Sequence, residues 1–258
     1  LSGGSARGLA HIGFLQVLEK AGIRPDTIIG TSMGALIGGL YSAGAKLKEV
    51  EKTVKKIGKL QEVLLFASWP QKSGLNKGDQ IIKIIKKFIG DQKIENLPTS
   101  FYAVATDINT GKKVVIHQGS LIKAIRASFA VPGLFTPIKL GDKILVDGGV
   151  IDSLSLDVAN RLRGQLVIVS DILSRCGKTK ITSYSGMIAI LLRTLEIIRE
   201  PSMKITPTIS KNTIIVQSPM EKVNWLDYHR AEQIINIGRL ATQKKLMLIK
   251  ARFKKVKE

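Results

Sequence analysis

Two spacings of apolar residues alternate along the chain. Short apolar runs, many of them β-branched, recur at residues 27–29, 101–105, 114–116, 144–146, 166–169 and 214–216. The segments between them carry apolar residues every three or four positions, which is the period of an amphipathic helix. Short buried strands that alternate with helices are typical of a largely parallel sheet covered on both faces. The pattern therefore predicts a three-layer α/β/α sandwich.

Two helices are predicted in the first fifth of the chain. Residues 10–21 place Ile12, Leu15 and Leu18 on one side, and Gly22 follows where the helix should end. Residues 33–43 form a second helical segment that is rich in Gly and Ala. Small side chains allow a helix to approach its neighbour closely, so we expect this second helix to press against the sheet.

Two further helical segments are both amphipathic and basic. Leu47, Val50, Val54 and Ile57 repeat at helical spacing among lysines, and residues 81–88 do the same between Lys83, Lys86 and Lys87. The preferred interpretation is an apolar stripe that faces the core and a lysine face in solvent. The alternative is a surface that settles on anionic lipid.

Length and composition favour one globular domain over residues 1–258. The chain is 44% hydrophobic with a mean hydropathy of +0.13, and no apolar run reaches the roughly 18 to 20 residues of a membrane span. The single Cys176 cannot form an intramolecular disulfide, which favours a reducing, cytoplasmic location. The sequence begins at Leu1, directly before a glycine-rich loop, which leaves room for a leader or a first strand ahead of it and keeps export open.

Charge is unevenly distributed along the chain. Forty Lys and Arg residues against twenty Asp and Glu give a formal net charge of +20. Residues 1–45 are nearly balanced, whereas residues 46–93 and 239–257 are rich in lysine. Such a field attracts phosphate-bearing partners, either anionic lipid or nucleic acid. No nucleic-acid module is recognisable, and aromatic residues at 5% offer little for base stacking, so no nucleic-acid partner is expected.

A G-x-S-x-G motif carries the candidate nucleophile. It consists of Gly30, Thr31, Ser32, Met33 and Gly34. The motif follows a predicted strand directly and precedes a predicted helix, which is the context of a sharp turn that exposes a serine hydroxyl. The N-terminus of the following helix adds a positive dipole beside any negative charge that develops there. Ser32 is therefore the predicted nucleophile.

A glycine-rich loop precedes the first helix. Its residues are Gly3, Gly4, Ser5, Ala6, Arg7 and Gly8. Such a loop can direct several backbone N–H groups at one oxygen, either of a phosphate or of a tetrahedral intermediate. The P-loop lysine is missing, and Ser5 interrupts the full dinucleotide pattern. Beside a serine turn, the loop is interpreted as an oxyanion hole.

Two candidates could activate Ser32. Asp147, followed by Gly148 and Gly149, comes directly after the strand at residues 144–146, and its glycines allow a sharp turn beside another segment. A carboxylate can take the serine proton itself. Ser32, Asp147 and His229 also follow the chain order of an α/β-hydrolase triad. However, His229 lies in a polar helical stretch, and the residues given before Ser32 leave space for only one strand, so the Ser32–Asp147 dyad is preferred over the triad.

Together these three motifs resemble the patatin-like phospholipase family. Its signature is a G-G-G-x-R/K-G loop, G-x-S-x-G and D-G-A/G, in the same order as here. Further matches are residues 105–107 with Thr110 and Gly111, and residues 124–132 running on to 135–137. The match is densest over residues 1–156; residues 157–258 would complete the strands and add a C-terminal basic helix. The resemblance implies a patatin-like α/β/α fold.

The resemblance also implies an activity and its residues. Ser32 would be acylated, and Asp147 would act first as base and then as acid. The N–H groups of Gly3, Gly4 and Ser5, helped by Arg7, would hold the oxyanion. The expected reaction is hydrolysis of a lipid acyl ester, of phospholipase A or lysophospholipase type, with no metal or organic cofactor. Separately, the lysine-rich charge distribution of residues 46–93 leads us to expect the site at an anionic membrane surface.

Two departures from the family pattern bear on this expectation. Ser5 stands in place of the usual third glycine of the loop, and residues 154–156 stand where relatives usually carry a proline. The first concerns the oxyanion hole and the second the geometry of the loop after Asp147. A non-enzymatic regulator or scaffold on the same fold is the alternative function.

Overall fold

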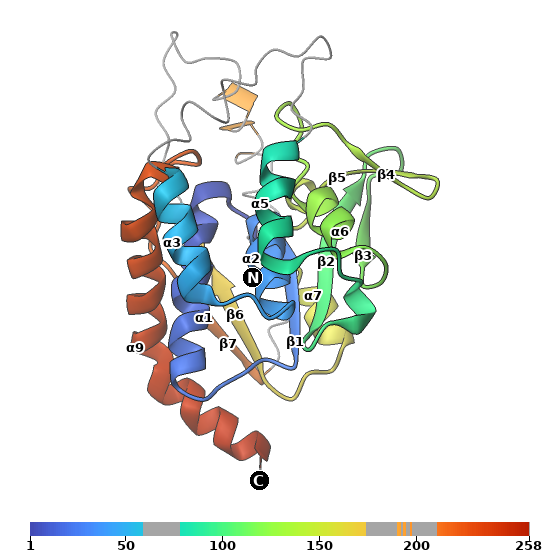
Figure 1. Ribbon diagram of the computed structural model, residues 1–258. Helices are drawn as coiled ribbons and strands as arrows, with labels where there is room; N and C mark the ends of the chain where they lie inside the picture. The colour runs from blue at the N-terminus through green and yellow to red at the C-terminus, as the bar shows by residue number, and fades with distance from the viewer. Residues whose placement is uncertain (59–77, 174–189, 192, 195–196, 198–210, 258) are drawn as a thin grey trace.

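The computed structural model in Figure 1 describes residues 1–58, 78–173, 190, 191, 193, 194, 197 and 211–257. Cys176 lies outside the described residues, as does part of the basic stretch at 46–93. Within the described residues, no helix is long and apolar enough to cross a membrane.

The apolar runs form the strands. They are β1 (Thr27–Thr31), β2 (Ser100–Asp107), β3 (Lys112–Ile116), β4 (Ile138–Leu140), β5 (Lys143–Asp147), β6 (Val167–Asp171) and β7 (Thr213–Gln217). β1 pairs with β2, and β6 with β7, in parallel. β3 and β5 run antiparallel to β2, and β4 runs antiparallel to β5. The α/β architecture is as predicted.

The first two residues connect the five-stranded sheet to the two-stranded sheet. The Leu1 amine donates to the Ile29 carbonyl at 2.8 Å, and the Thr31 N–H donates to the Leu1 carbonyl at 3.2 Å. On the other side, the Ser2 N–H donates to the Ser170 carbonyl of β6 at 3.2 Å. Residues 1 and 2 therefore lie between β1 and β6 and place the glycine-rich loop at the end of both strands.

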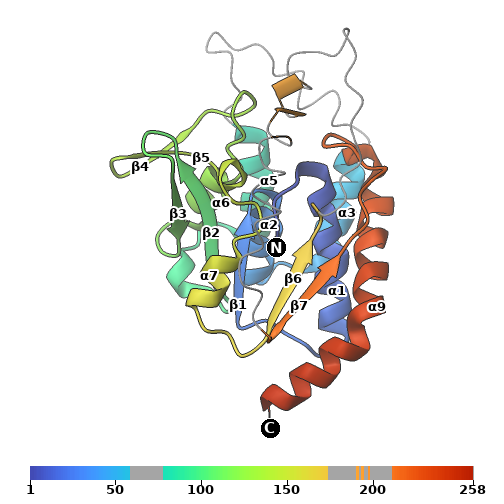
Figure 2. The same ribbon diagram turned by 180° about the vertical axis from the view of Figure 1, so that it is seen from behind.

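Helices and short 3₁₀ turns connect the strands. They are η1 (Ser5–Leu9), α1 (Ala10–Lys20), α2 (Met33–Ser42), α3 (Leu47–Gly58), α5 (Asp79–Ile89), η2 (Ile94–Asn96), α6 (Leu121–Ser128), η3 (Gly148–Val150), α7 (Leu156–Arg161), η4 (Tyr228–Arg230) and α9 (Ala231–Lys257). Of these, α1, α2, α3 and α5 correspond to the predicted helices. Figures 1 and 2 show α2, α5 and α6 on one face of the β1–β2 sheet and α7 on the other. This layering confirms the sandwich.

Close approach at two glycines fixes two of the helix contacts. A Cβ on Gly38 of α2 would lie 2.7 Å from Cγ2 of Ile28, so the helix presses on β1 as its composition predicted. The long helix α9 runs beside α1 (Figure 1), where a Cβ on Gly238 would lie 2.0 Å from the Ala10 carbonyl oxygen. Because no side chain fits at these contacts, the core beneath the glycine-rich loop is tightly packed.

Candidate active site

The pairing around β2 brings the two candidate catalytic motifs together. β3 pairs with residues 103–107 of β2, and this range overlaps the residues paired with β1 (100–104) and with β5 (105–107). β3 therefore lies along one edge of β2, and β1 and β5 share the other edge. Thr31, the last residue of β1, lies opposite Val104, and Asp147, the last residue of β5, lies opposite Ala105. Since β1 is parallel and β5 antiparallel to β2, their carboxyl ends meet there. Ser32 is therefore beside Asp147.

Ser32 occupies the sharp strand-to-helix turn that the sequence predicts. Its backbone has φ 55° and ψ −121°, in a region that L-residues other than glycine rarely adopt. Its side chain is buried, with the residue 5% exposed, and Oγ donates to Oδ2 of Asp147 at 2.6 Å. A Cβ on Gly34 would lie 2.3 Å from the Leu1 carbonyl oxygen, so the turn tolerates no side chain at that motif position.

Ser128, at the end of α6, holds the backbone of Ser32. Its Oγ accepts from the Ser32 N–H at 2.9 Å and donates to the Val104 carbonyl at 2.6 Å. Sequence reasoning did not single out Ser128 as a site residue. The signal present was its place within residues 124–132, which match the family pattern as a block. Ser128 fixes the turn to β2.

Asp147 is held by hydrogen bonds on both carboxylate oxygens. It is 1% exposed, its Oδ1 accepts from the Gly149 N–H at 2.7 Å, and its Oδ2 accepts from Ser32. A Cβ on Gly148 would lie 2.2 Å from the Val104 carbonyl oxygen, which accounts for the glycine after the aspartate. The carboxylate is thus oriented toward the Ser32 hydroxyl and can accept its proton.

The glycine-rich loop lies against Ser32, but one of its predicted donors is engaged elsewhere. A Cβ on Gly3 would lie 3.3 Å from Cβ of Ser32. The structure corrects the role expected of the Gly3 N–H, which donates to the Ser153 carbonyl at 2.9 Å. Among the described residues, the N–H groups of Gly4 and Ser5 have no hydrogen-bond acceptor. These two remain available to an oxyanion.

Arg7 and Gly8 support the loop from inside the protein. The buried Arg7 side chain donates from Nε to the Val223 carbonyl at 2.8 Å, and its Cζ lies 6.0 Å from the ring centroid of Trp225. Arg7 therefore contacts residues 223 and 225, and its expected help to the oxyanion stays a prediction. Gly8 contacts Met33, because a Cβ at Gly8 would lie 2.3 Å from the Met33 Cγ.

The two histidines of interest occupy different environments. His229 is exposed in η4, and the Asp147 carboxylate accepts from Ser32 Oγ and from the Gly149 N–H. His11 is buried beneath the loop, and burial lowers its pKa to about 3, so it is neutral. Its Nε2 donates to the Ser2 carbonyl at 2.8 Å, which leaves Nδ1 to accept from Ser170 Oγ at 2.8 Å. His11 thus anchors the loop to β6, a role that the sequence did not reveal.

An apolar cavity opens beside Ser32. The apolar sides of α3 and α5, predicted to face the core, form two of its walls, and α2 and residues 129–135 contribute others. Its lining includes Val54, Ile57, Ile81, Ile84, Phe88 and Leu134. The few polar lining groups include Ser32, Ser5 and Tyr228. Such a lining favours the burial of apolar groups next to the Ser32 hydroxyl.

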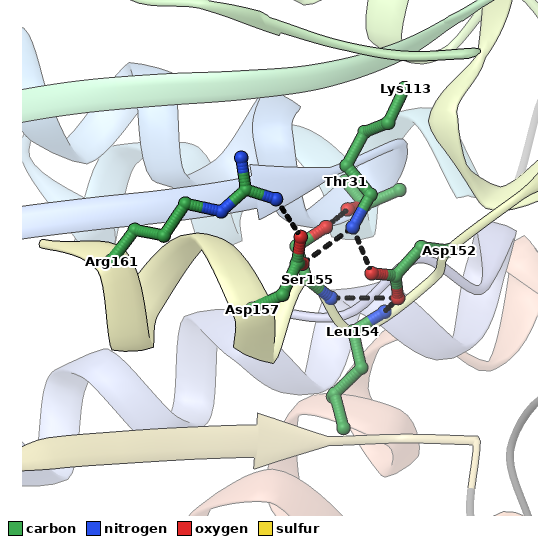
Figure 3. Close-up of polar contacts among 7 residues, drawn as sticks. All are labelled: Thr31, Lys113, Asp152, Leu154, Ser155, Asp157 and Arg161. Carbon is green, nitrogen blue, oxygen red and sulfur yellow. Dashed lines mark hydrogen bonds and ion pairs between the residues drawn. The ribbon is translucent and has the colours of Figure 1, made fainter. Parts of the chain in front are cut away.

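Charged side chains fix the loop that follows Asp147 (Figure 3). Lys113 of β3 lies 2.5 Å from both Asp152 and Asp157. Asp152 Oδ1 also accepts from the N–H groups of Leu154 and Ser155, each at 2.9 Å. Ser155 Oγ is in turn hydrogen-bonded to Thr31 Oγ1 at 3.2 Å, directly before Ser32. The network occupies the segment where relatives carry a proline.

Fold and site together define an α/β protein with a serine–aspartate pair at the meeting point of two strands and an apolar cavity beside it. The chain belongs to the patatin-like phospholipase family, because the model of that family matches residues 1–160.

Individual relatives cover different parts of the chain. An uncharacterised NTE family protein of Mycobacterium bovis is 37% identical over 156 residues, which are 60% of this chain and 43% of that protein. Lysophospholipase NTE1 of Saccharomyces cerevisiae is 30% identical over 264 residues, which cover 92% of this chain and 16% of that protein. The chain therefore spans less than half the length of these curated relatives.

A solved structure shares the fold. The crystal structure of VipD from Legionella pneumophila superposes with a TM-score of 0.50 at 15% sequence identity, over 95% of this chain and 65% of that chain. Identity at this level supports the shared architecture alone.

Proposed function

We propose that the protein is a serine acyl hydrolase that cleaves a fatty acyl ester of a lipid through a Ser32–Asp147 dyad. The observation that carries the proposal is the 2.6 Å hydrogen bond from Ser32 Oγ to buried Asp147, in a strained turn that opens into an apolar cavity. Strained backbone persists where the surroundings enforce it, and such sites are often functional.

The reaction would take two steps. Asp147 accepts the Ser32 proton as Oγ attacks the ester carbonyl, and the N–H groups of Gly4 and Ser5 donate to the resulting oxyanion. The intermediate collapses to acyl-Ser32 as Asp147 returns the proton to the departing alcohol oxygen. A water molecule then loses a proton to Asp147 and attacks the acyl carbon. As the fatty acid leaves, Asp147 returns this proton to Ser32 Oγ, which restores both residues.

The apolar cavity supports a lipid as the acyl donor. Its walls carry aliphatic and aromatic side chains close to Ser32, and exposed lysines follow the same two helices on the outside. The relatives named lysophospholipase add support for a phospholipid, of phospholipase A or lysophospholipase type. Neither feature supports a phosphate or dinucleotide cradle.

Geometry favours the dyad over the triad and over a non-enzymatic scaffold. The direct contact between Ser32 and Asp147 leaves no place for an intervening imidazole, and His229 is exposed. A scaffold would have no need of a serine held at φ 55°.

Covalent labelling tests the proposal. A fluorophosphonate probe should label the native protein and fail to label Ser32→Ala. With a p-nitrophenyl acyl ester, Asp147→Asn should lose about three orders of magnitude or more in kcat, whereas His229→Ala should keep activity close to native. An unlabelled native protein would exclude the enzyme, and an active Asp147→Asn with an inactive His229→Ala would exclude the dyad.

We also propose that α3 and α5 form a peripheral contact with anionic membrane. Lys48, Lys52 and Lys56 of α3 are exposed, as are Lys83 and Lys87 of α5, while the opposite sides of both helices line the cavity. Lysines around a cavity that accepts acyl chains would attract lipid phosphates and bring Ser32 to its substrate.

A further inference from the structure

A segment far from the family motifs runs along the glycine-rich loop. Residues 223–228, called here the clamp segment, make three successive contacts with it. Arg7 Nε donates to the Val223 carbonyl at 2.8 Å, and the Ala6 N–H donates to the Trp225 carbonyl at 3.0 Å. The third contact joins Ser5 Oγ to the Tyr228 hydroxyl at 2.9 Å. The clamp segment lies outside residues 1–160, to which the family model matches.

The contact at Ser5 occurs where the loop is strained. Ser5 has φ 50°, a left-handed conformation that favours glycine, and serine replaces the third glycine of the family signature at this position. A serine must therefore be held in this conformation by its surroundings. Its hydroxyl makes a hydrogen bond to Tyr228 that glycine could not make.

Tyr228 is well placed to hold Ser5. Its carbonyl oxygen packs on α3, because a Cβ on Gly58 would lie 2.3 Å from it. Its side chain lines the same cavity as Ser5 and Ser32. Burial and the nearby Asp147 charge raise the pKa of Tyr228, so its hydroxyl stays protonated at neutral pH and can donate to Ser5 Oγ.

We propose that Tyr228 is a positioning residue whose hydrogen bond to Ser5 holds the N–H groups of Gly4 and Ser5 in the geometry that receives the oxyanion. This hydrogen bond stabilises at Ser5 the positive-φ conformation that a glycine would adopt without strain. The inference rests on the proposed function, because the oxyanion belongs to that reaction. It assigns part of the active site to a region beyond the family motifs.

A double-mutant cycle tests the pair. Removing one hydrogen bond should lower kcat about five- to tenfold in Tyr228→Phe and in Ser5→Ala. KM should change less than about twofold, because phenylalanine keeps the ring in the cavity wall. In the Ser5→Ala background, Tyr228→Phe should lower kcat by less than about twofold, because the bond is already gone. Ser5→Gly, which relieves the strained φ, should lose less activity than Ser5→Ala.

Matched controls separate positioning from general destabilisation. Tyr102→Phe removes a hydroxyl from β2, where the ring stacks on His117. Arg163→Gly relieves an exposed left-handed residue with φ 50°. Both should keep native kcat. Hydrogen exchange of the amides of residues 4–7 should accelerate in Tyr228→Phe and remain native in Tyr102→Phe.

The outcomes distinguish this inference from the function on which it rests. If the native protein is not labelled by the fluorophosphonate, both the proposed function and this inference are overturned. An active native protein in which the Tyr228→Phe and Ser5→Ala effects multiply, or in which Ser5→Gly is as impaired as Ser5→Ala, overturns the inference alone. Unchanged exchange at residues 4–7 in Tyr228→Phe also overturns it.

Discussion

The backbone of Ser32, with its positive φ, is held from both sides. Its N–H donates to Ser128 Oγ, and its carbonyl accepts from the N–H groups of Ala35 and Leu36 in α2. Hydrogen bonds to both α6 and α2 therefore stabilise the unfavourable φ of Ser32. Because Ser128 also donates to β2, its loss would free the turn that presents Oγ to Asp147.

Ser128→Ala should lower kcat about tenfold and destabilise the protein by about 1 to 2 kcal/mol, because the Ser32 N–H and the Val104 carbonyl lose a buried partner. Ester hydrolysis and thermal unfolding measure the two effects. Ser120→Ala is the matched control, since Ser120 caps the same helix at its other end, where its Oγ accepts from Lys123 N–H. It should lose stability and keep kcat. Equal kcat losses in both variants would contradict the role of Ser128.

The loop after β5 is the element that joins the parts of the site. It carries Asp147 at its start, its Ser153 carbonyl fixes Gly3, and its Ser155 hydroxyl contacts Thr31. Lys113 of β3 holds the loop through Asp152 and Asp157. Burial alone would raise the pKa of Asp157, but hydrogen bonds and charge from Lys113 and Arg161 lower it.

Lys113→Met should destabilise the protein by about 1 to 3 kcal/mol at neutral pH, because two partly buried carboxylates lose their cation. The folded-state pKa of Asp157 lies below its unfolded value, so its contribution is present above about pH 4 and is lost as the pH falls further. The free energies of unfolding of the native protein and of Lys113→Met, measured with denaturant, should therefore converge at acidic pH.

Lys112→Met, on the same strand and exposed, is the control and should show no such pH dependence. The activity of Lys113→Met should fall with its stability, because the loop positions both Asp147 and Gly3. A variant with native activity and native stability would contradict the network's role.

At the scale of the whole molecule, three helices meet at one carboxylate. Glu51 of α3 accepts from Gln16 of α1 at 2.8 Å, pairs with Lys55 at 2.9 Å and is also bound by Arg239 of α9. Burial raises the pKa of Glu51, but the hydrogen bonds from these three side chains lower it to about 2. Glu51 thus ties the C-terminal helix to the helix that follows the glycine-rich loop.

Glu51→Gln should destabilise the protein by about 1 to 3 kcal/mol at pH 7, because a carboxylate with a depressed pKa stabilises the fold only while ionised. The difference from native should be complete above the usual glutamate pKa and should disappear as the pH falls toward about 2. Unfolding free energies over this range measure it. Glu49→Gln, exposed on the same helix, should remain close to native at every pH.

Membrane contact is a second property of the whole molecule. Replacing Lys83 and Lys87 by Gln should weaken binding to vesicles that contain phosphatidylglycerol about tenfold or more, since each lysine near such a surface contributes about 1 kcal/mol. Co-sedimentation measures it. Lys139 and Lys143, exposed on β4 and β5, provide a control pair of equal charge. Equal binding of the native protein to neutral and anionic vesicles would contradict the proposed contact.

Local features of this protein could be predicted from its sequence. The β-branched runs become strands, the periodic segments become helices, and Ser32 occupies the strand-to-helix turn that its two glycines indicate. Each of these depends on the spacing of residues that are neighbours in the chain. The sequence also indicated which helices are amphipathic, but not that their apolar sides would line a cavity beside Ser32.

Contacts between distant segments were decided only by the tertiary structure. Ser32 and Asp147 meet because β1 and β5 end at consecutive residues of β2, and strand direction and register are not encoded in either motif alone. Likewise, the Ser153 carbonyl accepts from the Gly3 N–H, and the Val223 carbonyl accepts from Nε of the buried Arg7. The sequence determined which residues could do chemistry; packing across the sheet decided which of them face one another.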